Sequence, residues 1–273
     1  MEVSAPGAPA IPADWLYTQI CNKGIANTAD LIWANFLSSI KRNLPWLEPL
    51  RARPERLIVV GSGPSLAHTY ERVGKDQEDG ALVMAINSAA PWLREKGIVP
   101  NYHALIDPQP ILAEFVMDAG DETIHLLASS VHPVVFDRLS NRKVVLWVAD
   151  HGLGELGYMV VSRSKGIPLI VGGGMSMTNR AVSLGAAMGF RKFDFHGVDS
   201  SWNEKTHIDR DTPPNADAVL TVRCADREFK TTIQLFAQAR EFIDLAKMWR
   251  SRGLRIRVFG DGLLPTLCRK EKP

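Results

Sequence analysis

The sequence of 273 residues lacks a long apolar run. No segment reaches the roughly 18 to 20 consecutive apolar residues that a helix needs to cross a bilayer. The N-terminus carries acidic Glu2 and several prolines, where a signal peptide would have basic residues before an apolar stretch. We therefore expect a cytoplasmic protein without a membrane span.

The sequence also has few cysteines and a small net charge. The three cysteines, Cys21, Cys224 and Cys268, lie far apart without a C-x-x-C spacing, so neither a disulfide framework nor a zinc site is indicated. The 32 basic and 30 acidic residues leave a formal charge of +2, too balanced to indicate a nucleic-acid or membrane surface by itself. A Gly-x-Ser-x-Gly motif is absent as well, so covalent hydrolysis is not indicated.

Short apolar segments alternate with segments of helical periodicity from residue 57 onward. The pattern predicts strands at 57–60, 81–86, 102–106, 124–128, 144–148, 169–171, 193–196 and 255–259, with helices at 91–96, 111–118, 178–188 and 231–252. Such alternation is typical of an α/β fold with a doubly wound, mostly parallel, Rossmann-like sheet. Ligands of these sheets bind beyond the carboxyl ends of the strands.

The chain is expected to divide at residue 54. The first dozen residues are rich in Ala and Pro and predict a loose tail, and residues 14–50 predict a small helical preface. Residues 55–273 would then form a nucleotide-binding α/β catalytic domain.

A glycine-rich loop directly follows the first predicted strand, with the sequence Gly61-Ser62-Gly63-Pro64-Ser65. Its backbone N–H groups and hydroxyls can be aimed at a phosphate at the start of the next helix. The loop is neither a P-loop nor the dinucleotide fingerprint Gly-x-Gly-x-x-Gly. We interpret it as a nucleotide site, with a tight turn that binds no ligand as the alternative.

A second glycine-rich loop has the sequence Gly172-Gly173-Gly174-Met175-Ser176 and precedes another helix. Its residues Gly173, Gly174 and Ser176 could contact the other side of a nucleotide. The alternative is a flexible connection after a strand.

Three further residues could carry chemistry. Asp107 and Asp199 follow predicted strands, where a carboxylate can hold a divalent cation such as Mg²⁺, orient a ribose or act as a base. Either could equally cap a turn. His207 is a candidate general base because imidazole titrates near neutral pH, although a loop histidine can simply be solvated.

These motifs occur in the order seen in the hydroxymethylpterin pyrophosphokinase-like family. The ordered set consists of the first glycine-rich loop, Asn87-Ser88-Ala89, Asp107-Pro108, Ser129-Ser130, the second loop and Gly197-Val198-Asp199. That family looks like the catalytic domain of motility-associated flagellin glycosyltransferases and is similar in fold to CMP-sialic-acid-dependent sialyltransferases. The resemblance covers roughly residues 55 to 202.

The resemblance implies roles for individual residues. Gly61, Gly63, Pro64 and Ser65 would cradle donor phosphates, Asn87 would reach the phosphate or ribose, and Ser62, Ser129, Gly173, Gly174 and Ser176 would complete the donor site. Asp107 and Asp199 would border that site, and His207 is the only histidine after Asp199 that could serve as base. Asp199 is followed by Ser200-Ser201 instead of the family's aliphatic or aromatic residue, which leaves the acceptor open.

Three functions follow from these expectations. The first is a glycosyltransferase with a nucleotide-sugar donor, the second a Mg-dependent pyrophosphokinase that uses ATP and a pterin alcohol, and the third a non-catalytic nucleotide-binding protein. The acceptor stays open among a glycan, a protein, DNA and a small alcohol. DNA is included because basic residues gather between 240 and 257. The sequence does not decide whether the protein forms a homo-oligomer.

Overall fold

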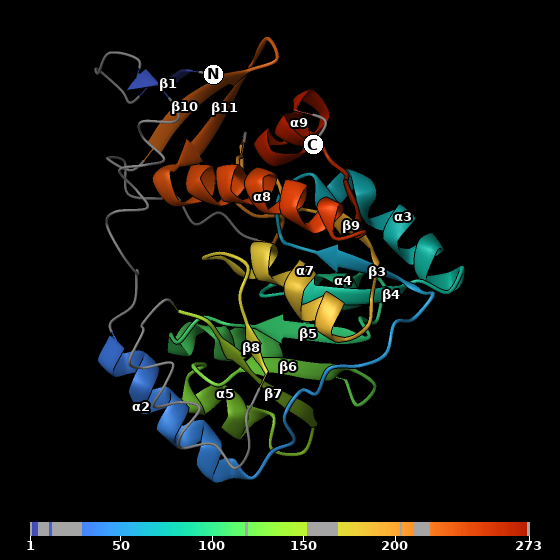
Figure 1. Ribbon diagram of the computed structural model, residues 1–273, viewed down its shortest axis with the longest axis vertical. Helices are drawn as coiled ribbons and strands as arrows, with labels where there is room; N and C mark the ends of the chain where they lie inside the picture. Colours follow the sequence, from blue (N-terminus) through green and yellow to red (C-terminus); the bar gives the residue numbers. More distant parts are fainter. Residues whose placement is uncertain are drawn as a thin grey trace.

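The computed structural model describes residues 2–4, 11–12, 29–117, 120–151, 169–202, 204–209 and 219–271. Its centre is a parallel sheet of eight strands in the order β12-β9-β3-β4-β5-β6-β7-β8 (Figure 1). The strands are β3 (Arg56–Val60), β4 (Leu82–Ile86), β5 (Tyr102–Leu105), β6 (Ile124–Ala128), β7 (Lys143–Ala149), β8 (Ile170–Val171), β9 (Lys192–His196) and β12 (Arg255–Val258). The predicted doubly wound α/β fold is confirmed.

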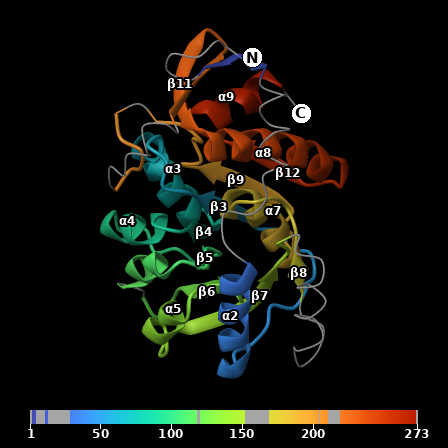
Figure 2. The same cartoon turned by 90° about the vertical axis from the view of Figure 1, so that its left-hand side faces the viewer.

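Helices cover both faces of this sheet (Figure 2). On one side lie α3 (Leu66–Glu78), α4 (Ala89–Glu95) and α5 (Pro133–Arg138), and on the other α7 (Met177–Ala187) and α8 (Ile233–Ser251). Ile58 and Val60 of β3 pack in a cluster with residues of α3 and α4, whereas Leu57 and Val59 join the cluster of α7 and α8. Successive strand residues point to opposite faces, so a strand buried on both sides is mostly apolar, as β3 is.

The chain reverses direction in the sheet beside β3. From β3 it winds outward through β4, β5, β6 and β7 to β8, and then α7 returns it to β9 on the other side of β3. The loops after β3 and β9 therefore leave from neighbouring strands toward different faces. This is the topological switch point at which doubly wound sheets bind ligands.

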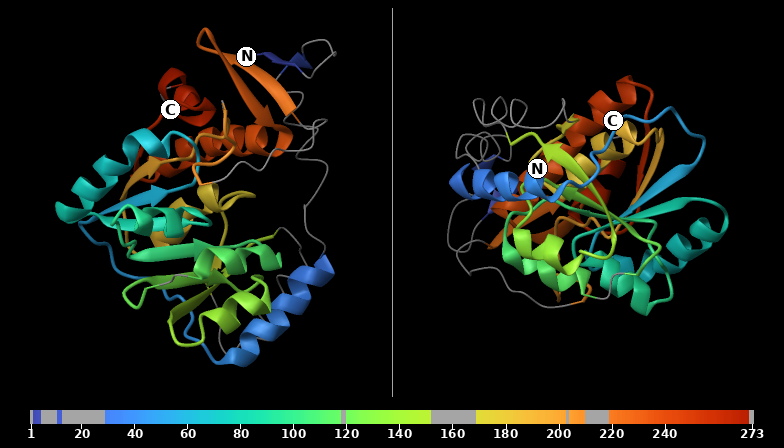
Figure 3. Two further views of the ribbon diagram at one scale, coloured as in Figure 1. Left: turned by 180° about the vertical axis from the view of Figure 1, so that it is seen from behind. Right: turned by 90° about the horizontal axis from the view of Figure 1, so that it is seen from below.

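A second, antiparallel sheet stands beside the first, in the order β11-β10-β1-β2 (Figure 3). Its strands are β1 (Glu2–Ser4), β2 (Ile11–Pro12), β10 (Val219–Cys224) and β11 (Arg227–Thr232). The expectation that the first dozen residues hold no regular element was wrong. Pairing with β10 fixes residues whose own composition favours a loose chain, and such long-range pairing leaves no local pattern.

The helical preface packs directly on the main sheet. Its described helices are α2 (Ala29–Ser39) and η1 (Ile40–Arg42), and Trp46 forms a parallel bridge with Leu146 of β7. The part of the preface predicted at 14–28 lies outside the described residues. The boundary at residue 54 stays a prediction.

Two further elements complete the fold. The segment expected as a helix at 111–118 is the 3-10 helix η2 (Pro110–Val116), and α9 (Leu263–Lys270) follows the last strand where only a turn was expected. Within the described ranges, none of the helices combines the length and apolarity that spanning a bilayer requires.

Candidate functional site

The loops after β3 and β9 are joined by hydrogen bonds at the switch point. Gly61 N donates to His196 O (2.9 Å), and Gly63 N donates to Gly197 O (2.8 Å). Ser65 N, at the start of α3, donates to Asp199 Oδ2 (2.9 Å). Pro64 has no N–H, so among the described residues this loop offers a ligand the Ser62 N–H and the hydroxyls of Ser62 and Ser65.

The glycines of the first loop allow this close contact. A Cβ at Gly61 would lie 2.5 Å from Gly197 O, and a Cβ at Gly197 would lie 2.3 Å from Gly61 O. Gly197 also has a φ of +61°, which favours glycine. The glycine spacing therefore serves the packing of two backbones, a use that the sequence pattern alone does not distinguish from phosphate binding.

Asp199 is buried at this junction, with 3% of its surface exposed. Burial raises the pKa of its carboxyl, and the neighbouring charge of Asp261 adds to this rise, whereas the Ser65 side chain, the Ser65 N–H and the Gly262 N–H lower it. Asp199 Oδ1 has no hydrogen-bond partner within the described part of the chain. A buried carboxyl with one unsatisfied oxygen is a candidate for contact with a ligand.

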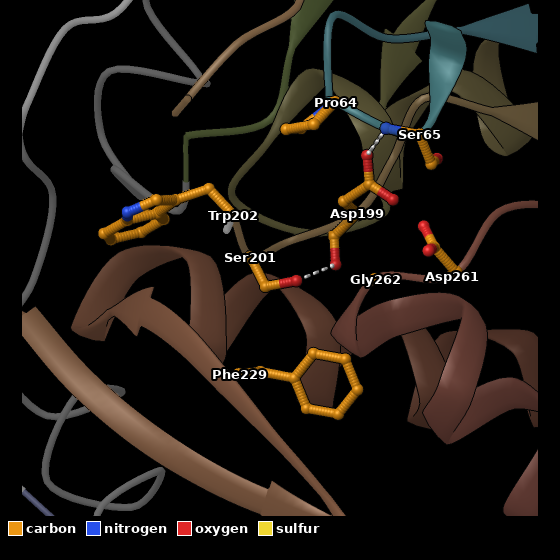
Figure 4. A pocket seen from close by; sticks show the side chains of 8 residues that line it. All are labelled: Pro64, Ser65, Asp199, Ser201, Trp202, Phe229, Asp261 and Gly262. Atoms are coloured by element: carbon orange, nitrogen blue, oxygen red, sulfur yellow. Dashed lines mark hydrogen bonds between the residues drawn. The ribbon is translucent and has the colours of Figure 1, made fainter. Parts of the chain in front are cut away.

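A small open pocket lies in front of Asp199 (Figure 4). Its walls come from the loops after β3, β9 and β12 and from β11, namely Pro64, Ser65, Asp199, Ser201, Trp202, Phe229, Asp261 and Gly262. Trp202 is 9% exposed, and its backbone N donates to Lys230 O of β11 (3.0 Å). The second sheet thus contributes to the wall of the pocket.

His207 lies in a segment that contacts the first loop. Ile208 N donates to Ser62 O (2.8 Å), which ties this segment to the glycine-rich loop. The Nδ1 atom of His207 is 3.2 Å from Thr206 Oγ1. The structure thus brings the candidate base close in space to the loop proposed for the donor.

Asp107 lies apart from Asp199. Its strand, β5, is three strands away from β9, which corresponds to about 14 Å at the usual strand spacing. Asp107 Oδ1 accepts a hydrogen bond from Gln109 N (2.9 Å), as a turn-capping aspartate does. Carboxylates this far apart would not hold the same ion, and no cluster of three or more His, Cys, Asp or Glu side chains suited to a metal is found among the described residues.

Asn87 and Ser129 also follow strands of the sheet. Asn87 directly follows β4, beside the first loop, with a left-handed φ of 49°. Its main-chain oxygen is 2.8 Å from His103 Nε2, while its Oδ1 has no partner among the described residues. Ser129 directly follows β6 and is buried, with its N–H donating to Trp147 O (2.8 Å).

The second glycine-rich loop is fastened to α8 by Glu241. Met175 N donates to Glu241 Oε2 (2.9 Å), which also accepts from Asn179 Nδ2 (2.7 Å). Gly173 and Gly174 have φ values of +109° and +98°, and Ser176 caps α7 by accepting from Asn179 N (3.3 Å). The N–H group of Met175 is thus already hydrogen-bonded to the carboxylate of Glu241.

The sequence reasoning missed Glu241 and Asp261. Glu241 lies on a long helix with no local sign of its partner. Asp261 lies between Gly260 and Gly262, directly after β12. A strand followed by Gly-x-Gly is the same signal that singled out Gly61 and Gly63, so this pattern could have identified it.

Comparison with solved structures supports the fold. The Maf glycosyltransferase from Magnetospirillum magneticum AMB-1 matches with a TM-score of 0.62 and 16% identity, over 93% of this chain and 43% of that chain. The present chain thus spans less than half the length of that relative. Two mammalian sialyltransferase structures match at 12% identity, with TM-scores of 0.40 and 0.42, over 95% and 96% of this chain and 89% and 90% of theirs.

Comparison at the level of sequence identifies the family. No curated protein matches the chain. The model of one protein family, described as 6-hydroxymethylpterin diphosphokinase MptE-like, matches residues 34–205, which is more than half of the chain. This match confirms the resemblance seen in the ordered motifs, and the chain belongs to the 6-hydroxymethylpterin diphosphokinase MptE-like family.

Proposed function

We propose that this protein is a glycosyltransferase that moves a sugar from a nucleotide-activated donor to an acceptor hydroxyl. The observation that carries the proposal is the contact between the His207 segment and the first glycine-rich loop, through Ile208 N and Ser62 O. It joins a candidate base to a loop at the switch point of the sheet, where nucleotides bind in doubly wound folds. The fold shared with a Maf glycosyltransferase is consistent with this activity.

The donor would lie along the carboxyl ends of β3 and β4. The hydroxyls of Ser62 and Ser65 and the Ser62 N–H can donate to its phosphate, and the unpartnered Oδ1 of Asn87 can accept from a ribose hydroxyl. Ser129 and the second loop, with Gly173, Gly174 and Ser176, would border the far side of the nucleotide.

The transfer needs one proton acceptor. His207 would take the proton of the acceptor hydroxyl while that oxygen forms a bond to the anomeric carbon of the sugar. The bond from the anomeric carbon to the phosphate oxygen breaks, and the leaving phosphate keeps the electron pair. Asp199 would contact the donor at the pocket.

A nucleotide panel combined with one substitution tests this proposal. A ligand that binds the native state raises the melting temperature, so the stabilising nucleotide-sugar identifies the donor. His207→Gln should then lower kcat for sugar transfer by about 10² to 10⁴, the usual contribution of a general base, with little change in the donor KM. The matched control is His68→Gln, because His68 is exposed on α3. Equal loss in both variants, or none in either, would contradict the role of His207.

A second candidate is a diphosphokinase that transfers diphosphate from ATP to a pterin alcohol, and the family description favours it. It predicts release of AMP from ATP in the presence of Mg²⁺ and a hydroxymethylpterin, with no dependence on a nucleotide-sugar. The third candidate, a non-catalytic nucleotide-binding protein, predicts binding without turnover of either donor.

The remaining assignments are proposals of the same kind. We place the protein in the cytoplasm, with a glycan, a protein, DNA or a small alcohol as the acceptor. A transfer assay with each acceptor class, once the donor is known, separates them.

A further inference from the structure

Helix α8 contacts two loops of the proposed donor site from a single turn. Gln238 and Glu241 are three positions apart in α8, so their side chains lie on the same side of the helix. Glu241 Oε2 accepts hydrogen bonds from Met175 N (2.9 Å) and Asn179 Nδ2 (2.7 Å), and Gln238 Nε2 donates to Ser200 Oγ (3.0 Å). One turn of α8 therefore connects the second glycine-rich loop to the loop after β9.

The second glycine-rich loop depends on Glu241 for its shape. Gly173 and Gly174 have φ values of +109° and +98°, and consecutive glycines leave a chain free to adopt many other conformations. A Cβ at Gly174 would lie 2.7 Å from Glu241 Cδ, so a glycine at this position lets the carboxylate reach the loop. An N–H group forms a stronger hydrogen bond with a carboxylate than with a neutral oxygen. The bond from Met175 N thus favours one loop conformation among many.

Both ends of this loop are fixed by bonds that do not involve Glu241. Before the loop, Val171 O accepts from Arg180 Nη1 (2.7 Å). After the loop, Ser176 Oγ accepts from Asn179 N (3.3 Å), and both Asn179 and Arg180 are buried in the first turn of α7. Loss of the Glu241 carboxylate should therefore loosen the glycines of the loop while β8 and α7 stay in place.

The loop after β9 is held to the same helix at Ser200, which directly follows Asp199. Ser200 has a φ of +53°, in the left-handed region that costs free energy for a residue other than glycine. Thr231 Oγ1 donates to Ser200 O (2.8 Å), and Gln238 donates to the Ser200 hydroxyl. These bonds hold the chain beside Asp199 against α8. The second loop, which Glu241 holds on α8, is thereby kept in a fixed place relative to Asp199.

We propose that Glu241 is a positioning residue for the donor nucleotide, acting through the Met175 N–H group and the second glycine-rich loop. The inference rests on the proposed function, in which that loop borders the nucleotide. Glu241 holds the loop in its binding conformation before the ligand arrives. When only a fraction of the molecules has the binding conformation, the apparent affinity falls by that fraction. Removing the Glu241 carboxylate should therefore weaken nucleotide binding and leave the chemical step unchanged.

Amide hydrogen exchange tests the contact on the protein without ligand. In Glu241→Ala, exchange at Met175 should be at least about tenfold faster, because the N–H group loses its acceptor. Glu241→Asp, whose side chain is one methylene shorter, should show the same change and replaces the alanine variant if that variant does not fold. Glu241→Gln should keep wild-type exchange, because its amide oxygen can accept both hydrogen bonds. The matched control is Asp244→Ala, because Asp244 lies exposed on the same helix.

Isothermal titration with CMP, UDP, GDP and ATP measures the effect on binding. For the tightest of these nucleotides, Glu241→Ala and Glu241→Asp should raise Kd about tenfold, and Glu241→Gln and Asp244→Ala should stay within about threefold of the wild type. With the corresponding nucleotide-sugar, the donor KM should rise equally while kcat at saturating donor stays within about threefold. A contact that only stabilised the fold would lower the melting temperature and leave the Kd and KM of the folded protein unchanged.

The proposal is overturned by unchanged exchange at Met175 in both Glu241→Ala and Glu241→Asp, or by faster exchange with an unchanged Kd. It is also overturned if none of the four nucleotides binds the wild type. A wild type that binds a nucleotide but transfers no sugar would contradict the proposed function alone, because the Kd of each variant can still be measured. The two proposals can therefore fail separately.

Discussion

The carboxyl edge of the main sheet has two halves that differ in how their polar groups are satisfied. In the β3–β9 half, formed by the loops after β3, β9 and β12, Ser65 Oγ and Asp199 Oδ1 are buried and form no hydrogen bond of normal geometry with any described residue. In the β5–β7 half, formed by the loops after β5, β6 and β7, Asn35 donates to Pro108 O (3.0 Å) and Ser130 O (2.8 Å). Ser130 Oγ in turn donates to Ile106 O (3.2 Å).

Arg180 also holds backbone groups of the β5–β7 half in place, although its Nε atom has no partner among the described residues. Its Nη1 atom donates to Val171 O (2.7 Å), and its Nη2 atom donates to Asp150 O. In the β5–β7 half these side-chain hydrogen bonds connect the loops to one another, so their role is structural. Both halves have polar residues at strand ends in the sequence, so the location of such a residue does not by itself indicate ligand binding.

The largest effect is expected from breaking the β3–β9 half at Gly61. In Gly61→Ala the new Cβ meets the backbone oxygen of Gly197, which cannot rotate away, so we expect a loss of about 3 kcal/mol in the free energy of unfolding. Gly172→Ala is the control, because its Cβ would meet no atom within 4 Å. Urea denaturation measures both. Similar losses in the two variants would mean that the loops after β3 and β9 are not in tight contact.

The second-largest effect is a loss in the free energy of unfolding at acidic pH, which comes from a buried histidine in β6. Burial lowers the pKa of His125 in β6 to about 4. His125 therefore binds a proton more strongly in the unfolded chain than in the folded one. The contribution of neutral His125 to stability is complete above the unfolded pKa of about 6.5 and is lost as pH falls toward 4. At pH 5 the loss is about 2 kcal/mol for this residue.

His125→Leu isolates the contribution, because both ring nitrogens of His125 lack partners among the described residues. Chemical denaturation at pH 7 and pH 5 should show a smaller decrease for the variant than for the wild type. Parallel decreases in the two proteins would contradict the buried, neutral state of His125.

The smallest effect is expected from Asn35 in the β5–β7 half. Asn35→Ala removes two hydrogen bonds to buried carbonyls and should reduce the free energy of unfolding by about 1.5 kcal/mol. Urea denaturation measures this loss. An unchanged free energy of unfolding would contradict the role of Asn35 in connecting the loops after β5 and β6.

Much of the fold could be predicted from the sequence. A central strand carries a clear signature, as in Leu57-Ile58-Val59-Val60, because both of its faces are buried. The hairpin of β10 and β11 was missed. Its turn uses Ala225 and Asp226 at φ values of 50° and 59°, without the Asn-Gly or Asp-Gly pair that marks such turns.

The candidate site was predicted only in part. Asp199 and the first loop are neighbours in the structure, as the strand-end reasoning expected. Glu241 gave no local signal because its partners, Met175 and Asn179, lie more than 60 positions away. The sequence also did not decide the role of the glycines, since backbone packing and phosphate binding both require a residue that has no side chain.

By itself the sequence determined a parallel sheet with polar residues at the carboxyl ends of its strands, because alternation and burial are local properties of each segment. Only the tertiary structure decided which of those residues meet. The crossover through α7 places β9 next to β3, and β12 follows α8 and lies beyond β9, whereas β5 lies on the far side of β4. For this reason Asp199 faces Asp261, and Asp107 lies about three strand spacings away.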